Sequence, residues 1–212
     1  MIKIAPSILA ADVLNLERDA RRMMEAGADW LHVDVMDAHF VHNLAYSPDV
    51  VARLKEISTV PLDVHLMMDQ PGRFLDTFLD AGADCLTIHT EIGGDIGAML
   101  NRIRLRGARS GLALKPGTGI SAALPFLQDA DMILTMTVEP GFGGQELNES
   151  VMYKISELRD RGYTGEIEAD GGIKEENLGR LISRGLSVAV MGTAMYRAEN
   201  PAEMMRRLHA MG

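Results

Sequence analysis

The chain has 212 residues, 47% of them hydrophobic, a length that suits one domain with a full hydrophobic core. Its formal net charge of -9 argues against a nucleic-acid-binding surface, because such a surface needs clustered Lys and Arg. No apolar run approaches the roughly 20 residues of a membrane span, so we expect neither nucleic acid nor a membrane as a partner. A small phosphorylated metabolite is compatible with the charge, since local amides and dipoles decide whether a small anion binds.

The cysteine content and the first residues bear on location. Cys85 is the only cysteine, which rules out an intramolecular disulfide and fits a reducing compartment. The segment 1–7 leaves no room for a secretory signal. We therefore expect a cytoplasmic protein. We also expect a homo-oligomer, although the sequence does not specify the number of subunits.

Short apolar segments alternate with amphipathic, helix-like segments along the chain. The apolar segments predict strands at residues 2–8, 30–36, 61–66, 85–89, 111–114, 132–138, 166–170 and 188–191. The amphipathic segments predict helices at residues 13–26, 48–57, 73–81, 95–106, 121–128, 149–161, 175–184 and 201–211. Asp12 is a candidate N-cap for the first helix.

The junctions between helices and strands resemble one another. The sequence Ala-Gly-Ala-Asp at 26–29 recurs at 81–84, and Gly107, Gly162 and Gly185 stand where a left-handed helix C-cap is expected. Units of about 26 residues are close to the minimum for a right-handed βα crossover. They favour an α/β fold in which residues 1–212 form a single (β/α)₈ TIM-barrel domain. An open doubly wound sheet stays possible from the pattern, although its usual glycine-rich first turn is absent after Ile8.

The second expected strand carries an imidazole and a carboxylate on one face. Side chains two apart in a strand point the same way, so His32, Asp34 and Met36 share a face. The third expected strand repeats the pattern with His65 and Met67. Imidazole and carboxylate ligands suit divalent metals such as zinc, manganese or iron(II). Because two neighbouring expected strands both end in residues that can bind a metal, we expect these residues to form one site.

Polar residues gather where the expected strands end, which is where barrel enzymes place their functional residues. They are Ser7, His32, Asp34, His65, His89, Lys115 and Asp170. Asp170 would face the second and third strands from across the barrel mouth. We therefore predict a metal site formed by His32, Asp34, His65 and Asp170. The alternative is that these four are unconnected caps and hydrogen-bonded core groups.

Asp34 and Asp170 would then flank a bound substrate. Two carboxylates on opposite faces of one carbon can remove a proton from one side and return one to the other, which inverts the stereocentre. A cation bridging a ketone and the neighbouring hydroxyl would stabilise the charge of an enediolate. Met36, Met67 and Met136 would lie nearby and exclude water, or they would only fill the barrel.

Glycine-containing loops predict a phosphate site at the same end of the barrel. Their residues are Gly141, Phe142, Gly143 and Gly144 after the sixth strand, Gly171 and Gly172 after the seventh, and Gly192 and Thr193 after the eighth. Backbone N–H groups in such loops can turn toward a phosphate with no side chain in the way. Lys174 and Arg197, at the far edges, are the only cations of these loops. The alternative is that the glycines only form turns.

Several long motifs follow one another in a fixed order. They are residues 4–9 (IAPSIL), 32–37 (HVDVMD), 39–41 (HFV), 61–67 (PLDVHLM), 136–145 (MTVEPGFGGQ) and 170–173 (DGGI). Through nearly the whole chain these motifs resemble the ribulose-phosphate 3-epimerase family. The resemblance implies a barrel of the ribulose-phosphate-binding type and Asp34 and Asp170 as an acid/base pair. It also implies one divalent metal ion (zinc, iron(II), manganese or cobalt) held by His32, Asp34, His65 and Asp170.

The resemblance further implies a small-molecule ketose phosphate as substrate. The candidate substrate-binding residues are Ser7, Met36, His65, Met67, Met136, Gly141, Phe142, Gly143, Gly144, Gly171, Gly172, Gly192 and Thr193. Two positions depart from the family pattern: Ala38 stands where Gly is usual, and His42 where Pro is usual. If that glycine has a positive φ, Ala38 would cost about 1 kcal/mol or shift the loop.

These observations predict a metal-dependent epimerase that interconverts D-ribulose 5-phosphate and D-xylulose 5-phosphate at C3, by two-base proton transfer through an enediolate. Because Ala38 and His42 leave the preferred sugar open, an epimerase of D-allulose 6-phosphate is the alternative. Two other classes remain: a phosphate-binding barrel decarboxylase or Schiff-base aldolase, the latter requiring a desolvated lysine such as Lys115, and a non-catalytic sugar-phosphate binder.

Overall fold

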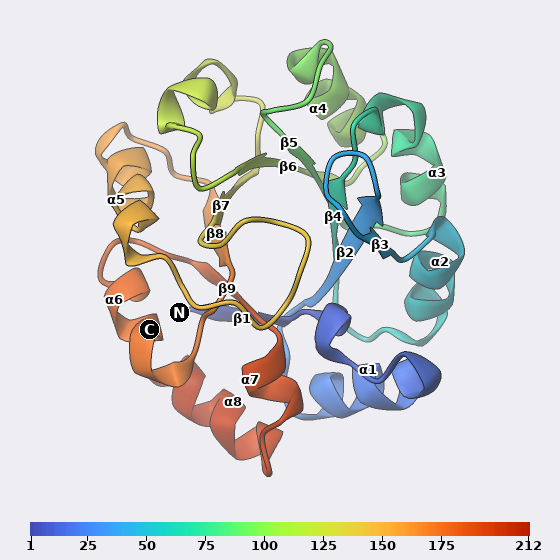
Figure 1. Ribbon diagram of the computed structural model, residues 1–212, viewed down its shortest axis with the longest axis vertical. Coiled ribbons are helices and arrows are strands. Elements are labelled where there is room, and N and C mark those ends of the chain that lie inside the picture. Colours follow the sequence, from blue (N-terminus) through green and yellow to red (C-terminus); the bar gives the residue numbers. More distant parts are fainter.

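Parallel strands form a ring at the centre of the molecule, and helices surround the ring (Figure 1). The structure is a computed structural model that describes all residues from 1 to 212. The strands of the ring are β1 (Lys3–Pro6), β2 (Leu31–Asp37), β4 (Leu62–Met67), β5 (Cys85–His89), β6 (Arg109–Leu114), β7 (Met132–Met136), β8 (Glu166–Asp170) and β9 (Val188–Met191). The predicted (β/α)₈ TIM barrel is confirmed.

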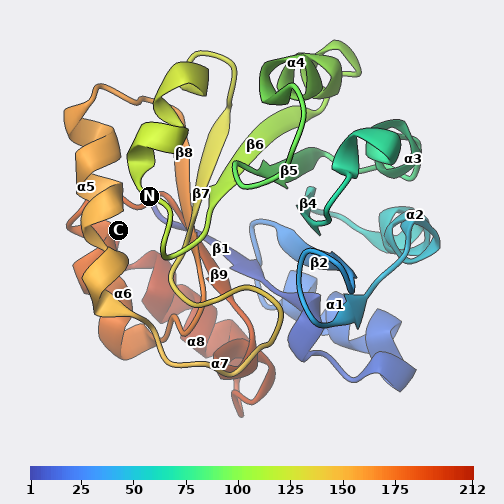
Figure 2. The ribbon, with the colours of Figure 1, turned by 45° about the horizontal axis from the view of Figure 1, so that its top comes forward.

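The helices cover the outer side of the strands (Figure 2). They are α1 (Leu16–Glu25), α2 (Pro48–Ile57), α3 (Leu75–Asp80), α4 (Ile96–Leu105), α5 (Tyr153–Asp160), α6 (Glu175–Ile182), α7 (Thr193–Tyr196) and α8 (Pro201–His209). None of them combines the length and the apolar character that a bilayer crossing needs.

The barrel closes between its first two strands. The strands follow one another in the order β1, β9, β8, β7, β6, β5, β4, β2, and a single parallel bridge between Ser7 and His32 joins the two ends of this series. The carbonyl of Ile4 also accepts a hydrogen bond from the N–H of Asp29 at 3.0 Å. Because the barrel is closed, the carboxyl end of β8 lies across the barrel mouth from the carboxyl ends of β2 and its neighbour β4.

Alternate residues of β2 have different surroundings. Val33 and Val35 belong to the main hydrophobic core, whereas Met36 packs with Val41 and Met67 in a separate small cluster. His32 is fully buried and shares the face of Met36. The predicted division of this strand into two faces is therefore confirmed.

The repeated Ala-Gly-Ala-Asp segments start two strands in the same way. Gly27 and Gly82 have φ values of 98° and 102° and end helices α1 and α3. The aspartate two residues later accepts a backbone hydrogen bond from a neighbouring strand: Asp29 from the N–H of Ile4 at 2.7 Å, and Asp84 from the N–H of Leu62 at 2.8 Å. The repeat therefore reverses the chain and secures the base of the barrel.

Three segments differ from the sequence-based expectation. Residues 121–128 form two 3₁₀ turns, Ile120–Ala122 and Leu124–Phe126, in place of an α-helix, because Pro125 lacks an N–H and its ring clashes with the preceding turn. The short strand β3 (Leu44–Ala45) pairs antiparallel with the end of β2, and α7 follows β9. Both were missed because such short elements carry no periodic pattern.

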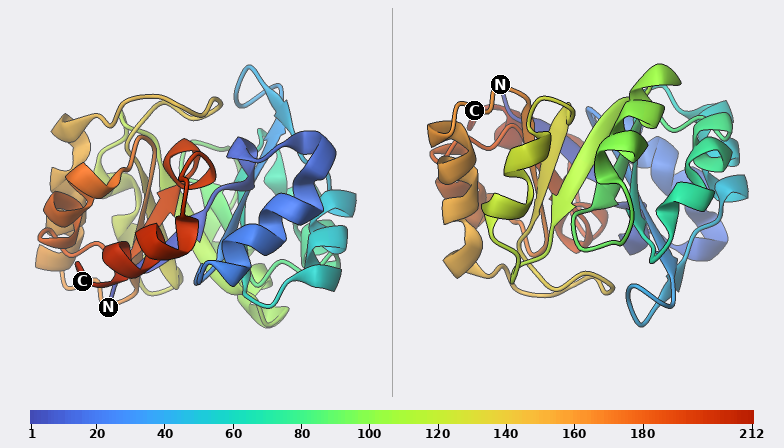
Figure 3. Two further views of the ribbon diagram at one scale, coloured as in Figure 1. Left: turned by 90° about the horizontal axis from the view of Figure 1, so that it is seen from below. Right: turned by 90° about the horizontal axis from the view of Figure 1, so that it is seen from above.

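Two loops project from one end of the barrel. The hairpin that contains β3 and the loop between β7 and α5 lie on the same side of the molecule, and the two chain termini lie together on the opposite side (Figure 3). In a barrel, the loops at the carboxyl ends of the strands form the functional face.

Candidate metal and active site

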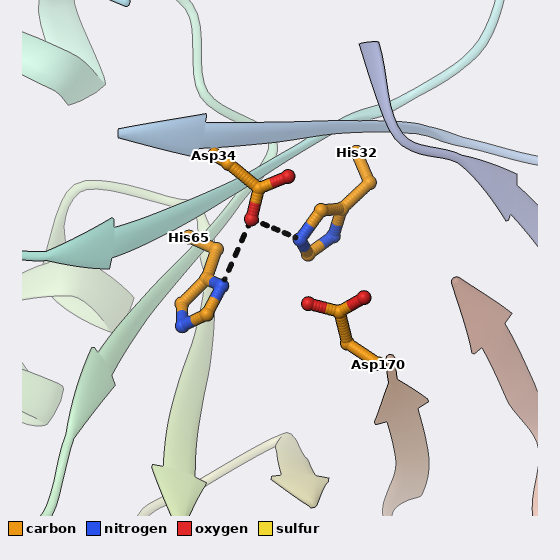
Figure 4. A group of neighbouring side chains, drawn as sticks. All are labelled: His32, Asp34, His65 and Asp170. Atoms are coloured by element: carbon orange, nitrogen blue, oxygen red, sulfur yellow. Dashed lines mark ion pairs between the residues drawn. The ribbon is translucent and has the colours of Figure 1, made fainter. Parts of the chain in front are cut away.

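Four side chains from three strands meet at the mouth of the barrel. His32 and Asp34 come from β2, His65 from β4, and Asp170 from the end of β8 (Figure 4). One nitrogen or oxygen atom of each lies within 4.8 Å of those of the others. Asp34 Oδ1 lies 3.3 Å from His32 Nε2 and 3.4 Å from His65 Nδ1. The structure thus brings together the four residues that the sequence suggested as metal ligands.

The imidazole nitrogens that face this group make no hydrogen bond. His32 Nε2 and His65 Nδ1 are buried and have no hydrogen-bond partner, although buried polar atoms are nearly always hydrogen-bonded. Two such nitrogens beside the carboxylates of Asp34 and Asp170 form a donor set that suits a borderline divalent cation. The residues present therefore fit a metal ion.

The two carboxylates of the group have opposite electrostatic surroundings. Burial alone would raise the pKa of Asp34, but the imidazoles of His32 and His65 lower it below its ordinary value. The Ser7 hydroxyl also donates a hydrogen bond to Asp34 Oδ2 at 2.6 Å. Burial and then the negative charge of Asp34 raise the pKa of Asp170 to about 6. Different surroundings of this kind allow two carboxyl groups to play different roles at one site.

Two more carboxylates lie behind His32. Asp63 Oδ2 lies 2.6 Å from His32 Nδ1, and Glu168 Oε1 lies 3.8 Å from the same nitrogen. Burial would lower the pKa of His32, but the charges of Asp34 and Asp63 raise it well above its ordinary value. Burial and the charge of Asp63 raise the pKa of Glu168 well above its ordinary value.

The sequence analysis did not identify Asp63 and Glu168, although a signal was present. Each stands two residues before a candidate ligand in a strand, Asp63 before His65 and Glu168 before Asp170, and therefore shares its face. Because charged residues are almost never fully buried without a partner, their place in apolar strands was itself a sign of the site.

On the side of its ring that faces away from Asp34, His65 contacts a second histidine. Its Nε2 lies 2.8 Å from Nε2 of His89, and His89 Nδ1 lies 3.0 Å from Glu91 Oε2. Burial lowers the pKa of His89 to about 4. Burial alone would raise the pKa of Glu91, but hydrogen bonds that include the one from His89 lower it to about 2. A neutral imidazole therefore stands between His65 and an ionised carboxylate.

A cavity of about 740 Å³ opens above the four-residue group. Its lining includes the predicted site residues Ser7, Asp34, Met36, Met67, Met136, Gly141, Phe142, Gly143, Gly144, Asp170, Gly171, Gly172, Gly192 and Thr193. His32 and His65 do not line it, because they are fully buried beneath. The cations Lys174 and Arg197 belong to the lining, whereas the exposed His42 does not.

Close backbone contact explains one of the glycines. Gly172 has a φ of 66°, and a Cβ at this position would lie 2.2 Å from the backbone nitrogen of Leu147 and 2.8 Å from the carbonyl oxygen of Gln145. No side chain can yield there, because both neighbours are backbone atoms. Gly172 therefore lets the loop after β8 touch the loop after β7, and the two loops form one wall of the cavity.

The hairpin after β2 reaches over to the same wall. The Asn43 side-chain amide donates a hydrogen bond to the carbonyl oxygen of Gly141 at 2.7 Å, and Val41 lies close to the same glycine. Within the hairpin, the N–H of Ala38 donates to the carbonyl of Asn43 at 3.0 Å. Ala38 has a φ of 61°, so the residue that departs from the family's glycine has a left-handed backbone.

Ala38→Gly is expected to raise the free energy of unfolding by about 0.5–1 kcal/mol. The substitution removes a left-handed strain of about 1–2 kcal/mol, and the greater freedom of glycine in the unfolded chain offsets about 0.4–1 kcal/mol of this gain. Urea unfolding measures the difference. The matched control is Ala45→Gly in the same hairpin, where φ is not positive and glycine should destabilise; a loss of stability at both positions would refute the strain argument.

Comparison with known proteins gives one consistent family. The model of the "Ribulose-phosphate 3 epimerase family" matches residues 3–196. The ribulose-phosphate 3-epimerase of Schizosaccharomyces pombe is 41% identical over 209 residues, which is 97% of this chain and 92% of the relative. That of Bacillus subtilis is 39% identical over 201 residues, 92% of this chain and 93% of the relative.

Solved structures resemble this chain in fold at much lower identity. KGPDC from Streptococcus mutans has a TM-score of 0.76 at 13% identity, and the match covers 100% of this chain and 97% of that one. The N-acetylmannosamine-6-phosphate 2-epimerase from Clostridium perfringens has a TM-score of 0.68 at 12% identity, covering 99% and 93%. At such identity the likeness concerns the barrel alone.

Proposed function

Because this chain belongs to the ribulose-phosphate 3-epimerase family, we propose that it is an isomerase that interconverts D-ribulose 5-phosphate and D-xylulose 5-phosphate, with residues 1–212 acting as one catalytic domain. The observation that carries this proposal is the meeting of Asp34 and Asp170, from opposite sides of the barrel, above two buried imidazoles. A binding protein would need no such pair of carboxylates, whereas inversion at a carbon by two-base proton transfer needs a group that can hold a proton on each face.

Asp34 and Asp170 are the proposed acid and base. One carboxylate removes the C3 proton on its side of the sugar, and the other carboxyl group returns a proton to the opposite face. When the reaction runs in reverse, the two exchange roles. The hydrogen bond from Ser7 to Asp34 Oδ2 holds this carboxylate in place and leaves Oδ1 directed at the histidines.

A divalent ion is the proposed cofactor, and His32, Asp34, His65 and Asp170 are the residues that would hold it. When bound, the ion supplies Lewis-acid stabilisation of the negative charge that forms on substrate oxygens as the C3 proton leaves. Zinc, iron(II), manganese and cobalt all accept imidazole and carboxylate ligands.

Apolar side chains and backbone amides complete the site. Met36, Met67 and Met136 line the cavity while being almost fully buried, and thioethers neither donate nor accept protons at neutral pH, so they would keep the intermediate away from water. The glycine loops that follow β7 and β8 are proposed to bind the phosphate through backbone N–H groups. Lys174 and Arg197 would add positive charge at its edge.

Location and assembly are proposed on the sequence arguments. We propose a cytoplasmic homo-oligomer; one relative, from Oryza sativa, is described as a cytoplasmic isoform, and one from Arabidopsis thaliana as chloroplastic. Gel filtration and cell fractionation test these two points separately.

A two-sugar assay with metal analysis on the same preparation tests the proposal. Turnover of D-ribulose 5-phosphate is expected to exceed that of D-allulose 6-phosphate, because the two positions that depart from the family, Ala38 and His42, do not line the cavity. In deuterium oxide, the product should carry deuterium at C3. Faster turnover of the allulose phosphate would favour the alternative sugar, and product without deuterium under exchange conditions would exclude two-base transfer.

A further inference from the structure

Behind His65, His89 and Glu91 continue a series of side chains that leads away from the candidate metal site, and neither residue lines the cavity above that site. His65 Nε2 lies 2.8 Å from His89 Nε2, and His89 Nδ1 lies 3.0 Å from Glu91 Oε2. The side chains of His65 and His89 are fully buried, and that of Glu91 is 19% exposed. His89 is the last residue of β5, and Glu91 follows two residues later.

Once a cation is held at the site, the protons of His65, His89 and Glu91 have one consistent distribution. A nitrogen that binds a cation must present a lone pair, so His65 Nδ1, which has no hydrogen-bond partner in the protein, carries no proton. The proton of His65 then lies on Nε2 and is donated to His89 Nε2. That nitrogen must accept, so the proton of His89 lies on Nδ1 and is donated to Glu91.

Glu91 and His89 are themselves held in place. The second carboxylate oxygen of Glu91, Oε1, accepts a hydrogen bond from the N–H of Lys115 at 2.7 Å, directly after β6. The ring of Phe40 packs on His89 with 4.6 Å between ring centroids. Because both oxygens of Glu91 accept, this position requires two acceptors, and a carboxylate is the side chain that supplies them.

We propose that Glu91 and His89 are positioning residues that fix the tautomer of His65 and so raise the affinity of the site for its divalent cation. This inference rests on the proposed function. Nδ1 of His32, which faces away from the four-residue group, contacts the carboxylate of Asp63 directly. Nε2 of His65 reaches a carboxylate, that of Glu91, only through His89. Hydrogen bonds of this kind to metal-binding histidines commonly contribute 10- to 100-fold in metal affinity.

Glu91→Gln tests the proposal with nearly no change in shape. The two donors, Lys115 N–H and His89 Nδ1–H, face different oxygens of Glu91, and glutamine places an NH₂ donor where one of these oxygens stands, so one of the two hydrogen bonds is lost. Titration of the metal-free protein with Zn²⁺ against a competing chelator should give an affinity about 10- to 100-fold lower than that of the wild type. Asp131→Asn is the matched control, because Asp131 accepts from the N–H of Ser110 at the other end of β6 and contacts no imidazole.

A second measurement needs no variant. In the Zn²⁺-loaded wild type, the ¹⁵N shifts of the two histidines should report a protonated Nε2 on His65 and a protonated Nδ1 on His89. A proton on His89 Nε2 would overturn the proposal even if Glu91→Gln does not fold. So would equal Zn²⁺ affinity of Glu91→Gln and the wild type. Failure of the wild type to bind Zn²⁺ would instead refute the metal site of the proposed function.

Discussion

Asp170→Asn is expected to lower kcat for the interconversion of the two pentulose phosphates about 10²- to 10⁴-fold, the usual contribution of a general acid or base. Asparagine keeps the size of the side chain and one oxygen, but it cannot hold or release a proton at that oxygen. The loss should therefore appear in both directions of the reaction. Steady-state rates measured from each epimer, with the metal content of the same preparation, give the comparison.

Isotope exchange distinguishes a missing base from a damaged site. With Asp170 replaced, Asp34 can still remove the C3 proton from its own face, so one epimer should lose C3 deuterium to water although it is not converted. Asp34→Asn should show the same behaviour with the other epimer. Loss of exchange from both epimers in both variants, at unchanged metal content, would contradict the assignment.

Glu166→Gln is the matched control for Asp170→Asn. Glu166 lies at the opposite end of the same strand, on the same face, where it pairs with Lys3. Removing its charge should leave kcat nearly unchanged, because it lies at the base of the barrel, away from the cavity.

Removal of the metal by a chelator is expected to abolish nearly all activity. Without a cation, the charge that forms on the substrate oxygens loses its main stabilisation, which is worth several kcal/mol. Zn²⁺, Mn²⁺, Co²⁺ or Fe²⁺ should restore activity, whereas Mg²⁺ should do so poorly, because it prefers an all-oxygen set of ligands. Full activity of a preparation shown by mass spectrometry to be metal-free would remove the cation from the proposal.

The same treatment should lower the melting temperature. A cation that binds only the folded protein adds about 2.7 kcal/mol of stability at 100 times its Kd, and it supplies a partner for the buried His32 Nε2 and His65 Nδ1. Calorimetry with increasing Zn²⁺ measures the shift. A melting temperature that does not respond to Zn²⁺ would show that the four residues do not hold it.

The sequence predicted the barrel because its evidence is local. Apolar segments, amphipathic segments and glycine at helix ends recur with each βα unit, and Gly107, Gly162 and Gly185 do have positive φ values. Asp12 does act as an N-cap, accepting from the N–H of Leu14 at 3.0 Å, but it caps the 3₁₀ turn Val13–Asn15 that precedes α1 and not α1 itself. Where local signals were weak or broken, the prediction was wrong or incomplete, as in the segment around Pro125 and in the two-residue strand β3.

Within one strand, the sequence alone determined which side chains share a face, because the side-chain period of a strand is two. This placed His32 with Asp34, and His65 with Met67. The closed barrel alone decided what each face meets: the bridge between Ser7 and His32 closes the ring, and only then does Asp170 lie opposite Asp34. The closed barrel also brings Asp63 into contact with His32, and it places His89 between His65 and Glu91. Contacts between strands depend on register and curvature, which arise from the packing of the whole chain and are not encoded in any one segment.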